Sequence, residues 1–72
     1  MSEPVVAPTA TYRAVVHVEP DGGYWAEVPE LPGCFTQGHT LDELYHNLPE
    51  AVGCHLDVDP AQVRIDALEM AA

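Results

Sequence analysis

The residues best able to do chemistry in this chain are its four histidines and two cysteines. His46 follows Glu43 by three positions, so on a helix the two side chains would share one side and could bind the same metal ion. Cys54 and His55 are adjacent, however, and their side chains would diverge by about 100° on a helix. Zinc sites use about four convergent ligands, and the sequence has neither a Cys-x-x-Cys nor a His-x-x-x-His pair. We therefore predict no metal site and no bound cofactor.

The cysteines are also weak candidates for nucleophilic catalysis. Cys34 follows a predicted turn, and His39 is nearby in the sequence. A catalytic thiol needs a positive environment that lowers its pKa and donors that stabilise the oxyanion. Nothing in the sequence around Cys34 identifies either feature. We therefore expect a binding protein and not an enzyme.

The charge of the chain is strongly negative. Twelve Asp and Glu residues face only Arg13 and Arg64, which gives a formal net charge of −10. Such a surface repels phosphate, so we predict that this chain does not bind nucleic acid directly. It would attract a basic protein and speed the encounter. The alternative is that the acidity only keeps the protein in solution.

The length of 72 residues predicts one small domain over residues 11–70, preceded by a disordered tail over residues 1–10. A domain of this size often gains burial by oligomerising, so we expect a homo-oligomer, either a dimer or a larger assembly. The N-terminus has neither a basic region nor a continuous apolar run, and no segment approaches membrane-spanning length. We therefore expect a cytoplasmic protein with reduced thiols and no membrane contact.

Apolar and polar residues alternate over residues 11–19 and again over residues 24–28, which indicates two β-strands. The Pro-Asp-Gly-Gly run at residues 20–23 is typical of a turn, so these strands are predicted to form a β-hairpin. Residues 34–37 can add a third short strand to a small antiparallel sheet. The face of the hairpin that we expect to be buried carries Ala14, Val16, Val18, Tyr24, Ala26 and Val28.

A helix is predicted after the third strand. The Thr-Leu-Asp-Glu run at residues 40–43 fits a capping box, in which Thr40 and Glu43 bind each other's backbone amides. Apolar residues then recur at helical spacing as far as Leu56, with acidic residues opposite, so the helix should cover one face of the sheet. Pro49 interrupts this pattern at a cost of about 3 kcal/mol. Because the apolar stripe continues past it, we expect one kinked helix and not two.

The last segment has two interpretations. Val63, Ile65 and Ala67 alternate with polar residues, which favours a final strand, with room for a single helical turn before it. The competing interpretation places residues 62–70 in a helix that is capped by Asp59 and has Pro60 as its first residue. We favour the strand, which completes an α+β domain in the order β-β-β-α-β.

Several of these motifs together resemble the HicB family of antitoxins. They are the Pro-Asp-Gly-Gly-Tyr-Trp-Ala run at 20–26, the Val-Pro-Glu-Leu-Pro-Gly-Cys run at 28–34, Thr-Gln-Gly at 36–38 and the helix cap at 40–43. The resemblance implies a truncated ribonuclease H-like fold that binds and blocks HicA, a small RNA-cleaving toxin. It also implies oligomers. His39 and Pro49 depart from the family pattern, and the C-terminal DNA-binding segment of many members is not expected here.

A ribonuclease H-like fold raises the question of nuclease activity. In that fold one acidic residue stands midway along the first strand, where this chain has Ala-Val-Val at residues 14–16. Glu43 and Asp66 could occupy other corners of such a site. Two-metal hydrolysis needs several converging carboxylates, and the set here is incomplete. We therefore do not expect nuclease activity.

The resemblance and the charge together predict the antitoxin of a HicA/HicB-type pair, which occludes the active face of a small basic toxin. The alternative is a solitary homo-oligomeric HicB-like domain with an unknown partner and no toxin to neutralise. Exposure and charge suggest which residues contact the partner: Trp25, Glu27, Glu30, Asp42, Glu43 and Glu50.

Overall fold

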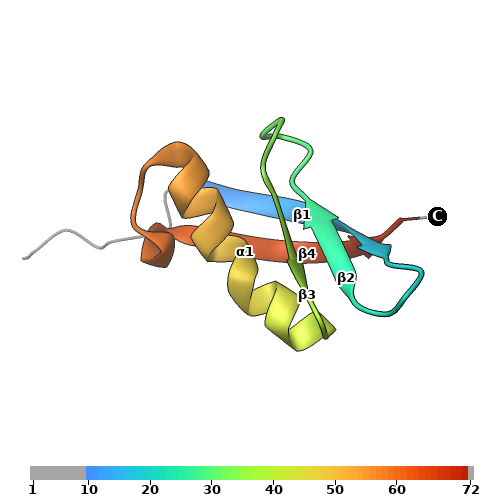
Figure 1. The fold of residues 1–72 in the computed structure, drawn as a ribbon. Helices are drawn as coiled ribbons and strands as arrows, with labels where there is room; N and C mark the ends of the chain where they lie inside the picture. The colour runs from blue at the N-terminus through green and yellow to red at the C-terminus, as the bar shows by residue number, and fades with distance from the viewer. Residues whose placement is uncertain (1–9, 72) are drawn as a thin grey trace, which may run out of the picture.

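The computed structural model describes residues 10–71. Residues 1–9 of the predicted tail over residues 1–10 lie outside this range, and Ala10 is the first residue of β1. The elements follow one another in the predicted order β-β-β-α-β (Figure 1). Their bounds are β1 Ala10–Val18, β2 Tyr24–Glu27, β3 Phe35–Gly38, α1 Leu41–Leu56, a 3-10 turn η1 at Pro60–Gln62, and β4 Val63–Met70. The final strand and the helical turn before it are therefore confirmed, and Asp59 caps only that turn, by accepting a hydrogen bond from the Ala61 amide.

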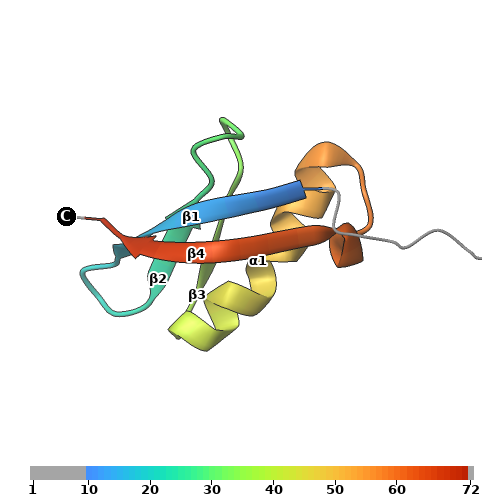
Figure 2. The same cartoon turned by 180° about the vertical axis from the view of Figure 1, so that it is seen from behind.

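Within residues 10–71 the strands form a four-stranded mixed sheet in the order β3-β2-β1-β4. The pairs β1–β2 and β2–β3 are antiparallel, as the hairpin and third strand predict. The strand β4 returns from the far end of α1 and pairs with β1 in parallel (Figure 2). The hairpin strand β1 therefore becomes a central strand with a partner on each side.

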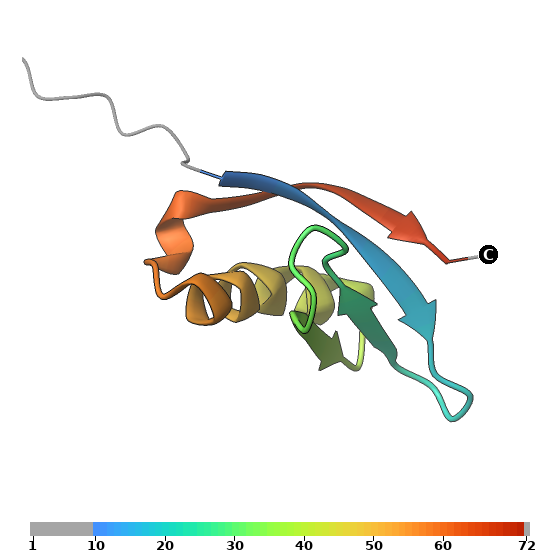
Figure 3. The same ribbon diagram turned by 90° about the horizontal axis from the view of Figure 1, so that it is seen from above.

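The helix α1 lies across one face of the sheet, and the apolar core lies between them (Figure 3). Leu44, Leu48 and Val52 on the helix are fully buried against the strands, as the helical stripe predicts. The core residues among those described are Ala14, Val16, Ala26, Val28, Cys34, Leu44, Leu48, Val52, Val63 and Ile65.

One residue of the predicted buried face is exposed. Val18 retains 63% of its accessible surface, and Tyr24, its partner across the hairpin, is half-buried. Val18 ends β1 and Tyr24 begins β2, so both flank the hairpin turn, which projects past the start of α1 (Figure 3). The alternation of the strand is correct at this point, but the helix does not extend far enough to cover it.

A β-bulge in β4 changes which side of the sheet Ala67 faces, in contrast to the sequence prediction. Tyr12 lies opposite Ile65, but the next residue of β1, Arg13, lies opposite Ala67, so Asp66 is an extra residue in β4. Val63 and Ile65 face the core, whereas Ala67 shares the opposite face with Arg13. The prediction that Ala67 lies on the same side as Val63 is therefore wrong, because the bulge reverses the alternation.

Two glycines allow close turns around the third strand. Gly33 ends the turn after β2 at φ +88°, a left-handed conformation that residues with a Cβ rarely adopt. At Gly38 a Cβ would lie 2.7 Å from the backbone nitrogen of Leu44. The end of β3 therefore packs directly against the first turn of α1, which fixes where the helix begins relative to the sheet.

The helix continues through Pro49 as one element, as the unbroken apolar stripe predicts. Because proline has no amide hydrogen, the carbonyl of Tyr45 lacks its normal helical donor. At the start of the helix the Glu43 amide donates to the Thr40 hydroxyl at 3.0 Å, as the capping box predicts. The Glu43 carboxylate accepts a hydrogen bond from the amide of His39, one residue before the predicted donor. The helix is therefore well defined at its start and weakened at its centre.

Replacing this proline tests how much it costs. We expect Pro49→Ala to raise the free energy of unfolding by about 1–2 kcal/mol, because it restores a hydrogen bond and removes a steric clash. The measurement is urea denaturation followed by circular dichroism. The neighbouring substitution Glu50→Ala is the control, with an expected change within about 0.5 kcal/mol. No gain from Pro49→Ala would mean that contacts of the proline ring compensate for the missing bond.

Candidate functional site

The six residues predicted to contact a partner lie on two opposite sides of the molecule. Asp42, Glu43 and Glu50 are exposed on the outer side of α1, and we call them the helix surface. Trp25 and Glu27 belong to β2 and point away from the helix, on the uncovered side of the sheet, which we call the open face. Glu30, in the turn after β2, lies beside the open face, 3.7 Å from Arg13.

The helix surface is acidic without a neutralising cation. Arg13 and Arg64 are the only basic residues besides histidine in the sequence, and both lie in strands. The carboxylate of Asp42 is 3.8 Å from the ring of His46 and remains highly exposed. The helix surface therefore presents a concentrated negative charge to solvent.

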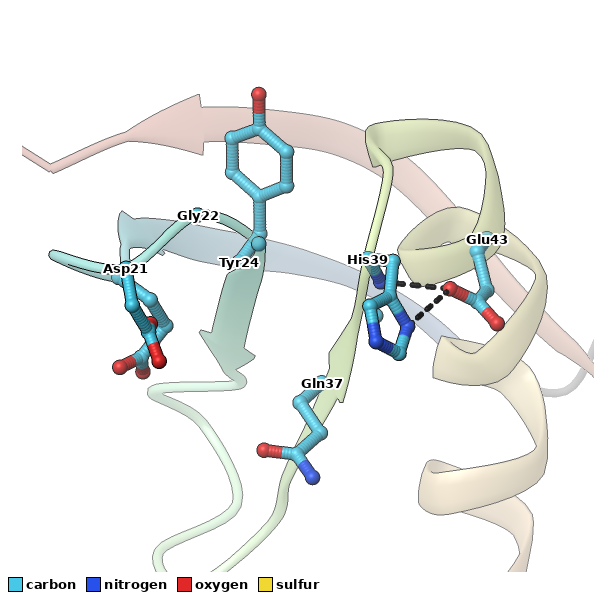
Figure 4. Close-up of a pocket in the computed structure, with 9 residues that line it drawn as sticks. Asp21, Gly22, Tyr24, Gln37, His39 and Glu43 are labelled. Atoms are coloured by element: carbon cyan, nitrogen blue, oxygen red, sulfur yellow. Dashed lines mark hydrogen bonds and ion pairs between the residues drawn. The ribbon is translucent and has the colours of Figure 1, made fainter.

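Glu43 has a structural role in addition to its charge. Its carboxylate accepts a hydrogen bond from the His39 amide at 2.6 Å and lies 3.4 Å from the His39 ring (Figure 4). The backbone hydrogen bond from His39 lowers the pKa of the Glu43 carboxyl, because it stabilises the ionised form, and the nearby histidine acts in the same direction. The helix cap therefore restrains the Glu43 side chain.

The open face carries three aromatic rings in contact. The rings of His17 and Trp25 are stacked, with their centroids 4.0 Å apart and their planes 9° from parallel. Trp25 also meets Phe35 edge to face at 6.4 Å. These rings form a strip across β1, β2 and β3, and we call it the aromatic strip. Phe35 keeps 64% of its surface exposed, whereas His17 and Trp25 are half-buried.

The charges of the open face are paired with one another. The ring of His17 lies 2.8 Å from the carboxylate of Glu27. Arg13 is placed between two carboxylates, 3.3 Å from Glu69 and 3.7 Å from Glu30. Isolated pairs of this kind add little stability at an exposed site. Arg13 offsets only part of the negative charge of the open face, whereas no arginine or lysine is paired with the helix surface.

A hollow between the hairpin turn and the start of α1 contains further polar side chains. Glu19, Asp21, Tyr24 and His39 line it together with Glu43 (Figure 4). Within residues 10–71, however, no three of the His, Cys, Asp and Glu side chains are placed to hold a metal ion. Among the described residues the hollow therefore offers polar groups without an assembled metal centre.

The thiol of Cys34 is not activated. Its side chain is buried in the core, and burial raises the pKa of the thiol, with a further contribution from Cys54. A raised pKa disfavours the nucleophilic thiolate. His39, which is close in sequence, is almost fully exposed at the helix start and bound to Glu43. The structure therefore does not bring Cys34 and His39 together as a catalytic pair.

Sequence reasoning missed part of the open face. The alternation of the strands does place His17, Trp25 and Glu27 on one face, but Phe35 was expected only as part of a third strand. Its contact with Trp25 depends on the pairing of β2 with β3, in which Glu27 lies opposite Phe35. The pairing of Arg13 with Glu69 likewise depends on the bulge in β4. Cross-strand register was the missing information.

A small α+β domain with an acidic surface on one side and an aromatic strip on the other has the features of a protein-binding module. Residues 12–70 match the family of HicB-like antitoxins of bacterial toxin–antitoxin systems, so the chain belongs to this family. The predicted resemblance is thereby confirmed, and the match extends over the last strand.

Individual relatives agree with this assignment. A UPF0150 protein of Archaeoglobus fulgidus is 43% identical over 47 residues, which are 65% of this chain and 68% of the relative. A UPF0150 protein of Thermoplasma acidophilum is 41% identical over 64% of this chain and 67% of its own length. One from Synechocystis is 39% identical over 64% of this chain and 58% of its own length. No solved structure matches the chain, and α1, the α-helix of the described residues, is too short and polar to cross a membrane.

The lowered pKa of Glu43 predicts a pH dependence of stability. A carboxyl whose pKa is lower in the folded state stabilises the fold above its unfolded pKa, which is about 4.3, and this contribution disappears as the pH falls through the lowered value. We expect Glu43→Gln to be less stable than the wild type at neutral pH and to approach it in acid. Urea midpoints measured from about pH 7 down to about pH 3 test this expectation. A difference that stays constant with pH would show that the charge of Glu43 does not contribute.

Proposed function

We propose that this chain is the antitoxin of a HicA/HicB-type pair and neutralises a small basic RNA-cleaving toxin by covering its active face. Membership of the HicB-like antitoxin family supports an antitoxin role. The observation that carries the finer proposal is the uncompensated acidity of the helix surface in a chain with a net charge of −10. An RNA-cleaving protein must present positive charge to its substrate, so this surface is complementary to such a toxin.

The helix surface is the docking site in this proposal. Asp42 and Glu50 carry charges that no arginine or lysine neutralises, and they stand on a rigid element whose other side is fixed in the core. Such a surface attracts a basic protein over a distance of about 10 Å at moderate salt. Glu30 on the sheet side is already 3.7 Å from Arg13, so it has less charge to offer.

The antitoxin is proposed to act by occlusion and without chemistry of its own. Once bound, it would exclude RNA from the toxin by occupying the same basic surface, and the remaining negative charge would repel phosphate. We also place the protein in the cytoplasm, where toxins that cleave RNA meet their substrate. The free thiols of Cys34 and Cys54 suit this reducing compartment.

An RNA-cleavage assay tests the function directly. The test takes as toxin a small basic protein encoded beside this chain, purifies it alone and incubates it with labelled RNA in increasing amounts of this chain. We expect cleavage to stop near equimolar antitoxin, and this chain alone to leave RNA intact. Undiminished cleavage would refute the antitoxin proposal and favour a solitary domain with another partner. Cleavage by this chain alone, lost on mutation of Glu43 or Asp66, would identify a nuclease instead.

Charge reversal on the two sides of the molecule tests the docking site. Asp42→Lys/Glu50→Lys and Glu27→Lys/Glu30→Lys change the net charge equally, so long-range attraction falls by a similar amount in both. We expect the helix variant to bind the toxin about tenfold more slowly than the sheet variant at low salt, with a flatter salt dependence. Stopped-flow association rates at several salt concentrations provide the measurement. The opposite order would move the docking site to the sheet side and leave the proposed occlusion intact.

A further inference from the structure

A shallow hollow on the open face adjoins the aromatic strip. The rings of Trp25 and Phe35 line it together with the carboxylates of Glu19 and Glu27. The register of the sheet explains this combination, because Glu27 lies opposite Phe35 and follows Trp25 by two positions on the same face of β2. Glu19 comes directly after the end of β1. The hollow therefore combines aromatic surface with negative charge.

No permanent cation neutralises the charge of this hollow. Arg13 and Arg64 are the only arginine or lysine residues of the chain, and neither lines it. The ring of His17 lies 2.8 Å from the Glu27 carboxylate. A neutral imidazole that donates this hydrogen bond holds the carboxylate in place and leaves its charge unchanged. The Glu27 side chain also keeps 44% of its surface exposed, so a ligand can reach it.

The rings beside the hollow are already fixed by their neighbours. His17 covers one face of the Trp25 indole, with the two ring planes 9° from parallel, and Phe35 meets Trp25 edge to face at 81°. Trp25 is half-buried in this arrangement, whereas Phe35 is 64% exposed. Groups that are held in position before binding lose little conformational entropy when a ligand arrives. A ligand would therefore meet a preformed surface.

The lining of the hollow suits a flat cation. The face of an aromatic ring attracts a cation, and a carboxylate accepts strong hydrogen bonds from one. The guanidinium group of arginine meets both requirements, because it stacks flat against a ring while its N–H groups point outward in the plane. A phosphate would be repelled by the two carboxylates, and an apolar side chain would bury them without a partner. The compact, strongly hydrated ammonium group of lysine fits a flat aromatic surface less well.

We propose that this hollow binds an arginine side chain of a basic partner protein. The guanidinium group lies against Phe35 and Trp25, and its N–H groups donate to the carboxylates of Glu19 and Glu27. The hollow is on the open face, on the other side of the sheet from the helix surface. The arginine contact is therefore additional to the docking proposed for the toxin and does not rest on it.

Titration with a short peptide tests the site without the toxin. The peptide Gly-Gly-Arg-Gly-Gly, blocked at both ends, is added to the full-length chain at constant ionic strength, and its control carries citrulline, which has nearly the same shape but no charge. Trp25 is the only tryptophan of the chain, so its fluorescence and its indole N–H resonance report on the hollow. We expect the arginine peptide to bind with a Kd of about 1–10 mM, and the citrulline peptide to give no saturable change up to about 50 mM.

Two variants examine the two parts of the lining. Glu19→Gln/Glu27→Gln removes both charges and should weaken binding of the arginine peptide at least about fivefold. Phe35→Leu removes the ring but keeps an apolar side chain, and should weaken binding about threefold. The matched control is Asp57→Asn/Asp59→Asn, which removes the same charge from exposed residues outside the lining of the hollow. Asparagine suits both the left-handed conformation of Asp57 and the capping role of Asp59, and we expect this control to bind within about twofold of the wild type.

Circular dichroism establishes that the variants are folded before they are compared. The absence of saturable binding by the arginine peptide would overturn the proposal, and so would equal binding of the citrulline peptide. An equal loss of affinity in Asp57→Asn/Asp59→Asn and in Glu19→Gln/Glu27→Gln would also overturn it, because the overall charge and not the hollow would then attract the peptide. None of these outcomes bears on whether the chain neutralises a toxin.

Discussion

The structure depends on the contact between the apolar stripe of α1 and one face of the sheet. Leu44, Leu48 and Val52 supply the helix side of this contact and are fully buried. Burying a leucine side chain contributes about 1.5–3 kcal/mol, so these three residues provide a large share of the stability available to a domain of this size. Because the core is formed on one side of the sheet, the contact also determines which side chains are left outside.

The residues left outside separate into two surfaces of different character. The outer side of the helix carries Asp42 and Glu50 without a compensating arginine or lysine. The open face of the sheet carries Trp25 and Phe35, and Arg13 there is paired with Glu30 and Glu69. Long-range attraction requires uncompensated charge, whereas close apolar packing requires that charges be absent or satisfied. The two surfaces therefore differ in charge pairing and in aromatic content, and they face opposite directions.

Local contacts around the start of α1 attach the helix to the sheet. The capping box fixes the first turn of α1 through Thr40 and Glu43, and Gly38 lets the end of β3 approach that turn closely. The side-chain amide of Asn47 also donates to the carbonyl of Gln37 at 2.9 Å, which ties the helix to the outer edge of β3. Much of the position of the helix is thus set by residues within ten positions of its first turn, while its far end is held by the returning strand.

The sequence alone determined the elements, their order and the membership of the HicB-like family, because each rests on short-range patterns. Alternation defines a strand, the run at 20–23 defines a turn, and the Thr40 cap with its apolar stripe defines the helix. The same patterns placed Trp25 and Glu27 together on one face and Asp42 with Glu50 on the helix. They could not show that these two groups lie on opposite sides of the folded domain.

Only the tertiary structure decided how distant segments meet. The parallel pairing of β4 with β1, the bulge at Asp66 that turns Ala67 away from the core, and the exposure of Val18 all depend on neighbours far away in the chain. Local periodicity specifies which side of an element is apolar, but it specifies neither the partner strand nor the length of sheet that a helix covers. Those outcomes follow from the geometry of the assembled layers, and they separate the acidic surface of this protein from its aromatic one.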